Sequence, residues 1–108
     1  MNTIEFLKEA TTVPSGGKSI PYLPVKSMDF KNIKLDVSGD GVISLQVEIL
    51  MGGRWAVSNV IRLSNYDITD AITVNNERYE ADVAGGNGVR ISVTSISGGD
   101  VTVIGRIY

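Results

Sequence analysis

The sequence predicts an all-β protein, an antiparallel β-sandwich of about eight strands with a jelly-roll-like arrangement. From Phe30 onward, apolar residues recur at every second position, which is typical of strands with one buried face. Clusters of Gly and Asn separate these alternating runs at short, regular intervals, as turns do in a sandwich or barrel. The length of 108 residues is enough for one hydrophobic core. We therefore expect one sandwich over residues 29–108, preceded by an arm over residues 1–28.

The arm is distinguished by its irregular composition. It holds all three prolines, Pro14, Pro21 and Pro24, and the Gly16–Gly17 break. Proline cannot donate a hydrogen bond to a central strand ladder, so this pattern favours an extended arm or an edge segment. Ile4, Phe6 and Leu7 fit one short strand, and a helix over residues 3–10 is the competing interpretation.

The arm also has more apolar side chains than a terminal segment that makes no contacts normally has. We expect the arm to contribute little to the sandwich core. We expect it instead to pack on a neighbouring subunit or a larger assembly, through strand addition and apolar anchors. The expected interaction residues are Ile4, Phe6, Leu7, Ile20, Tyr22 and Leu23.

The strands of the sandwich are predicted from the alternation itself. The runs begin near residues 33, 43, 55, 79, 89 and 101, and each has polar residues at the intervening positions. The residues predicted to be buried are Leu45, Val47, Trp55, Tyr79, Ile91 and Val103.

Two turn sequences resemble ligand-binding loops. Residues 36–41, Asp-Val-Ser-Gly-Asp-Gly, match the opening of a calcium loop, but the position that needs a bidentate acid is Val47. Residues 85–88 are rich in glycine, but a strand follows them where a phosphate loop would have a helix. Both are predicted to be plain hairpin turns, with no metal or cofactor bound.

Composition argues against several classes of function. The chain has no Cys and no His, which removes thiol and imidazole chemistry. Its net charge is −2 and its basic residues are scattered, so nucleic acid is not an expected partner. No apolar run approaches the length of a membrane helix, and the charges of Glu5, Lys8 and Glu9 interrupt any signal peptide, so we expect synthesis in the cytoplasm and no membrane partner.

Catalysis by paired carboxylates is not expected. Asp67 with Asp70 lies in a predicted loop, and Glu80 with Asp82 lies on the polar face of a predicted strand. Neither spacing is diagnostic of an acid–base pair, and a domain of this size offers little room for a deep cleft. The sequence therefore predicts a protein that is not an enzyme.

Aromatic side chains are the candidate platforms for a sugar ligand. Trp55 and Tyr79 fall on predicted inward faces, where core packing is the expected role. Tyr22, Tyr66 and Tyr108 are the aromatic residues expected at the surface.

Three segments in order resemble a known group of proteins. Residues 47–57 are a strand, a glycine turn and a strand led by Trp; residues 79–94 are two strands around a glycine-rich turn; residues 97–106 are a hairpin with a β-branched last strand. Together, over about residues 42–108, they are similar to the small jelly-roll or sandwich domains of tailed-bacteriophage virion proteins. Such domains occur as head decorations, head fibres and tail appendages.

The resemblance implies a structural or accessory role in a virion, with no catalytic residues to carry over. It implies contacts with other virion proteins and self-association, for which a trimer is the expected form. The alternative is a carbohydrate-binding β-sandwich module that recognises a cell-surface glycan.

Overall fold

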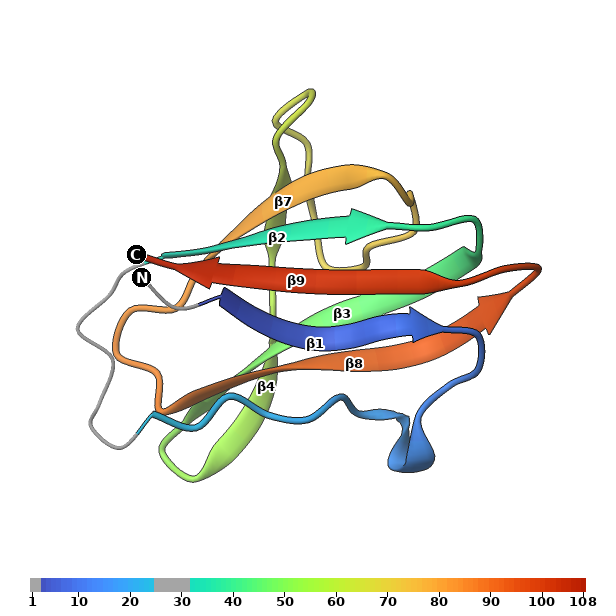
Figure 1. The fold of residues 1–108 in the computed structure, drawn as a ribbon. Coiled ribbons are helices and arrows are strands. Elements are labelled where there is room, and N and C mark those ends of the chain that lie inside the picture. The colour runs from blue at the N-terminus through green and yellow to red at the C-terminus, as the bar shows by residue number, and fades with distance from the viewer. Residues whose placement is uncertain (1–2, 25–31) are drawn as a thin grey trace.

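The computed structural model describes residues 3–24 and 32–108, which form an antiparallel β-sandwich (Figure 1). The predicted fold class is thus confirmed, with nine strands and one 3₁₀ turn, η1, among the described residues. No helix in these residues is long and apolar enough to cross a membrane. The elements are β1 (Thr3–Ala10), η1 (Ser15–Gly17), β2 (Asn32–Ser38), β3 (Val42–Met51), β4 (Arg54–Ser58), β5 (Val60–Arg62), β6 (Ile68–Thr69), β7 (Glu77–Asp82), β8 (Gly88–Ser97) and β9 (Val101–Ile107).

The strands divide into a sheet of six and a sheet of three. The larger sheet has the order β1-β9-β2-β7-β5-β6, and the smaller has the order β4-β3-β8. The chain passes from the small sheet to the large one between β4 and β5, where Asn59 separates the two strands. In Figure 1, β1, β9, β2 and β7 lie in one layer, and β3, β8 and β4 lie in the other.

The core lies between the two sheets and is built from the inward row of each strand. Leu45, Val47, Tyr79, Ile91 and Val103 are at most 1% exposed, which confirms five of the six predicted core residues. The Tyr79 hydroxyl donates a 2.8 Å hydrogen bond to the carbonyl oxygen of Val74. This bond satisfies the polar end of the largest fully buried side chain.

Trp55 is the sixth predicted core residue, and for it the prediction is wrong. Trp55 pairs with Leu50, and Leu50 pairs with Gly88. Paired residues in an antiparallel ladder lie on the same face of the sheet. This row alternates with the buried row of Val47 and Ile49, so Trp55 belongs to the outer face of the small sheet, where it is half-buried.

The first strand, β1, belongs to the sandwich. Residues 3–10 form a strand that pairs with β9, so the strand interpretation holds and the helix is excluded. Phe6 and Leu7 are only 4% and 7% exposed, so the expectation that the arm adds little to the core is wrong for these two residues. Phe6 packs over Gly105, where a Cβ atom would come within 2.7 Å of its ring.

Residues 18–22 of the predicted arm follow the β8 edge of the small sheet. After η1, Lys18 bridges to Ser92 and Tyr22 bridges to Val89, so this stretch lies antiparallel along β8. The predicted boundary between residues 28 and 29 lies outside the described residues.

The burial of Phe6 gives a test of the place of β1 in the core. Phe6→Ala should lower the free energy of unfolding by about 3–5 kcal/mol, because it removes buried ring surface and leaves a cavity. Ile20→Ala is the control: Ile20 is 79% exposed, and the change should stay within about 0.5 kcal/mol. Urea unfolding monitored by circular dichroism measures both, and equal losses for the two variants would contradict this account.

Candidate functional site

The candidate site is the outer face of the small sheet together with the segment that runs along its β8 edge, residues 18–23, which we call the edge segment. Its main chain is bonded to β8. The Ser19 N–H donates to the Ile91 carbonyl at 2.8 Å, and Tyr22 and Val89 exchange main-chain bonds of 2.8 and 3.0 Å. The strand addition predicted for the arm is therefore made on the chain's own sheet.

A cluster of charges ties the edge segment to the sheet face. Glu48 of β3 accepts hydrogen bonds from Arg90 Nε at 2.7 Å and from Lys18 Nζ at 3.2 Å. Lys18 Nζ also donates to Ser92 Oγ at 2.9 Å. Because Glu48 is only 9% exposed, it is a buried carboxylate held between two cations.

The surroundings of Glu48 keep it ionised. Burial alone would raise the pKa of the Glu48 carboxyl, but hydrogen bonds from Arg90 and Lys18 and their positive charges outweigh it. The pKa therefore lies below the ordinary value. A carboxylate with a lowered pKa is suited to a permanent ion pair and not to proton transfer near neutral pH.

Trp55 extends this cluster with an apolar surface. The Arg90 guanidinium lies over the Trp55 ring, 4.2 Å from its centroid, in a cation–π contact. Leu23 and Trp55 approach each other above Gly88, where a Cβ atom would lie 2.7 Å from Leu23 and 3.2 Å from the Trp55 ring. The outer face thus joins an ion-pair cluster to a small apolar surface.

The structure separates the six predicted arm residues into two groups. Phe6 and Leu7 are buried, and Ile4 and Tyr22 are partly buried against the core. Tyr22 is therefore not the exposed aromatic that was expected. In the edge segment, Ile20 is 79% exposed and Leu23 is 57% exposed, so these two present apolar side chains to solvent.

The other aromatic candidates lie elsewhere. Tyr66, in the turn between β5 and β6, is 76% exposed. Tyr108 is 41% exposed; its hydroxyl donates to Glu80 at 2.9 Å, and Lys34 lies over its ring. Tyr66 is thus the most exposed aromatic side chain among the described residues.

The sequence resembling a calcium loop forms the turn between β2 and β3. The Asp40 N–H donates to Asp100 Oδ1 at 3.1 Å, and the Gly39 N–H donates to Asn76 Oδ1 at 3.1 Å. Asp36 lies 3.5 Å from Arg78 on the neighbouring strand. Within residues 3–24 and 32–108, no group of three or more acidic residues is arranged to hold a metal ion.

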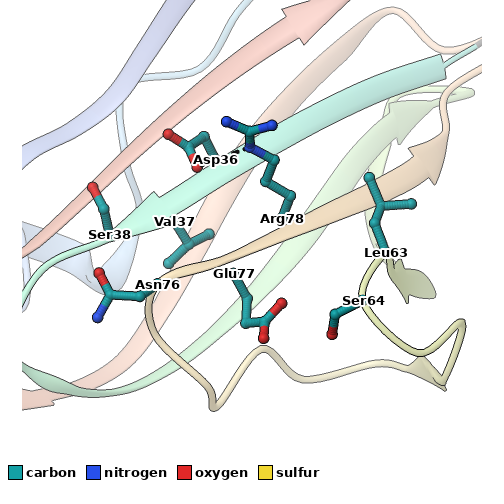
Figure 2. Close-up of a pocket in the computed structure, with 8 residues that line it drawn as sticks. All are labelled: Asp36, Val37, Ser38, Leu63, Ser64, Asn76, Glu77 and Arg78. Atoms are coloured by element: carbon teal, nitrogen blue, oxygen red, sulfur yellow. Dashed lines mark ion pairs between the residues drawn. The ribbon is translucent and has the colours of Figure 1, made fainter.

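A shallow groove lies on the large sheet beside this turn (Figure 2). It has a volume of about 470 Å³, and Figure 2 shows the paired Asp36 and Arg78 on one side of it, with Glu77 and Ser64 on the other. Glu77 accepts a 2.8 Å hydrogen bond from Arg62, which lowers the pKa of its carboxyl. Both carboxylates in the groove thus have a cationic partner, and the lowered pKa of Glu77 is opposite to the raised pKa that suits a general acid.

The fold is similar to those of two solved structures of prophage proteins. One is the SPBc2 prophage-derived protein YomS, with a TM-score of 0.84 and 19% identity, over 98% of this chain and 90% of that one. The other is the PBSX exported protein XepA, with a TM-score of 0.83 and 17% identity, over 98% of this chain but 37% of XepA. No protein-family model and no curated protein sequence matches the chain. At these identities the likeness shows a common fold.

The charge cluster predicts how stability depends on pH. Glu48→Gln should lower the free energy of unfolding at pH 7 by about 1.5–3 kcal/mol, because it removes hydrogen bonds between charged groups. The folded-state pKa of Glu48 lies below 4.5, so its contribution is present above that pH and is lost as the pH falls through the lower value. Urea unfolding of both proteins from pH 7 downward measures the difference, which should shrink in acid.

Glu5→Gln is the control for this series, because Glu5 is exposed on β1. It should change stability by less than about 0.5 kcal/mol at pH 7. A Glu48→Gln difference that stayed constant from pH 7 to acid would show that the charge of Glu48 does not stabilise the fold.

The structure of the turn between β2 and β3 predicts that calcium does not change the thermal stability of the protein. Millimolar calcium should leave the melting temperature unchanged, because a ligand stabilises only if it binds the native state. Differential scanning fluorimetry with calcium and with chelator makes the comparison. A rise in melting temperature that disappears in Asp40→Ala would contradict the assignment of this segment as a plain turn.

Proposed function

We propose that the chain is a non-enzymatic structural or accessory protein of a bacteriophage particle, in the head or the tail, that acts through protein–protein contacts. The observation that carries the proposal is the fold, which two prophage proteins share across 98% of this chain. The jelly-roll and virion resemblance of residues 42–108 points in the same direction. The location proposed is the virion.

The docking surface of this proposal is the edge segment. Ile20 and Leu23 are exposed, while Ser19 and Tyr22 beside them are fixed to β8 by main-chain bonds. Lys18 anchors the start of the segment through Glu48 and Ser92. Apolar side chains on a backbone that is already ordered lose little conformational entropy when a partner covers them.

A carbohydrate-binding module is the second candidate, and Tyr66 is the residue that favours it. An aromatic side chain that is 76% exposed at the tip of a turn is a suitable surface for stacking against a sugar. Trp55 is less suited, because Arg90 lies over its ring. Quenching of Tyr fluorescence by host glycans, lost in Tyr66→Ala, would favour this candidate over the first.

The docking role can be measured on particles. Purified particles of the encoding phage or prophage should contain the protein, as detected by mass spectrometry. Particles made without it should bind the added protein, and Ile20→Lys combined with Leu23→Lys should weaken that binding at least tenfold. Burial of one such side chain is worth about 1.5–3 kcal/mol, and 1.4 kcal/mol is a factor of ten.

Val42→Lys is the matched control, since Val42 is 69% exposed at the start of β3, away from the edge segment. It should bind particles as the parent does. Absence of the protein from particles would overturn the proposed function. If the variant with both Ile20→Lys and Leu23→Lys binds particles as well as the parent does, the edge segment is not the docking surface.

A further inference from the structure

The edge strands of the two sheets are protected unequally. The edge of β8 is covered by the edge segment, and β6 is only two residues long. The edge strand β1 carries exposed Glu5, Lys8 and Glu9, and its pairing with β9 contains two register shifts. Short length, charge and irregularity all discourage a strand edge from pairing with another chain.

The edge strand β4 is the least protected: its one charged residue, Arg54, stands at its first position. Its five residues pair with β3 without a register shift, and its sequence, Arg-Trp-Ala-Val-Ser, contains no proline. No other described strand lies on its outer side. Beside it is a hollow of about 230 Å³, which is lined by apolar side chains and by two polar ones: Ile49, Met51, Ala56, Val57 and Ala84, with Ser58 and Asp82. Met51 and Val57 are 54% and 44% exposed, so the open edge has an apolar border.

The turn before β4 determines which main-chain groups face outward. Gly52 and Gly53 both have positive φ, 59° and 77°, as a two-residue turn of type I′ requires. In such a hairpin the residues that flank the turn, Met51 and Arg54, form a hydrogen-bonded pair. By alternation along the strand, the main-chain N–H and C=O groups of Trp55 and Val57 are directed away from β3, toward the open edge.

We propose that a second copy of this chain pairs with this edge, β4 against β4, antiparallel about a two-fold axis at Ala56. In this register Trp55 lies opposite Val57 of the partner subunit, and Val57 lies opposite the partner's Trp55. Arg54 lies opposite the partner's Ser58, so no like charges meet. The strand is thus complementary to itself, and aromatic–β-branched pairs are among the favourable cross-strand pairs. The two small sheets become one continuous sheet of six strands.

This interface is independent of the proposed virion role, since it rests on the β4 edge alone. A two-fold contact between identical surfaces closes as a dimer. The proposal therefore predicts a dimer, where the resemblance implied a trimer. It also leaves the edge segment available to a different partner, because β8 and β4 are opposite edges of the small sheet.

The mass in solution tests the interface. Light scattering after size exclusion should give twice the chain mass of 11.6 kDa for the parent and the single chain mass for Val57→Lys. Val42→Lys introduces the same charge at another exposed valine and should remain dimeric. A monomeric parent, an odd-numbered oligomer or a dimeric Val57→Lys would overturn the proposal.

Cross-linking gives a second test that does not depend on the folding of Val57→Lys. The chain has no cysteine, so Ala56→Cys provides a single thiol at the proposed axis. Residues opposite each other in a non-hydrogen-bonded pair have Cα atoms about 4.5 Å apart, within the range of a disulfide. Mild oxidation should convert Ala56→Cys to covalent dimer at least tenfold faster than Val42→Cys. Equal rates for the two variants would contradict the two-fold register.

Discussion

Two stacked sheets have four edge strands, and the main-chain groups along each edge need a partner or a protection. In this sandwich, that requirement explains features of the strands that the packing of the core does not explain. It accounts for the edge segment that follows β8, for the charges and register shifts of β1, and for the brevity of β6. Whether an edge can bind another molecule depends on whether it is covered, charged, irregular or short.

The edge segment is held by charge as well as by main-chain bonds. Glu48 lies on the outer row of β3, where a carboxylate would ordinarily be solvated. Lys18 crosses from the edge segment to reach it, and Arg90 approaches from the neighbouring strand, so the three side chains cover part of the sheet face. A partly buried group of this kind orients the segment, because a different path of the chain would leave Glu48 with one cation fewer.

Much of the fold could be predicted from residue alternation, and the exceptions have physical reasons. Leu45, Val47 and Ile91 follow the period of two, and they are buried. Trp55 is not buried, although the alternation predicted that it would be. The two-residue turn at Gly52–Gly53 places it opposite Leu50 on the outer row. That signal was present in the sequence, since the turn length alone fixes the pairing.

Other features had no local signal. Phe6 and Leu7 are adjacent and both buried, which a strand with a single buried face does not predict. The register shift between Glu5 and Leu7 is visible only once β9 is in place. The cluster around Glu48 joins residues 30 and 42 positions apart in the sequence, so no spacing rule could bring them together. Of the six residues predicted for interaction, only Ile20 and Leu23 are exposed enough to serve as the predicted anchors.

The pairing of β1 with β9 has a consequence for how the protein is made. Thr3 lies opposite Arg106, so β1 pairs with a strand that is translated roughly a hundred residues later. Until β9 emerges, Phe6 and Leu7 lack the strand that β1 pairs with, and these apolar side chains stay uncovered on the nascent chain. Contacts of such long range are associated with slow folding and with exposure to aggregation. The large sheet can therefore close at β1 only after β9 has been translated.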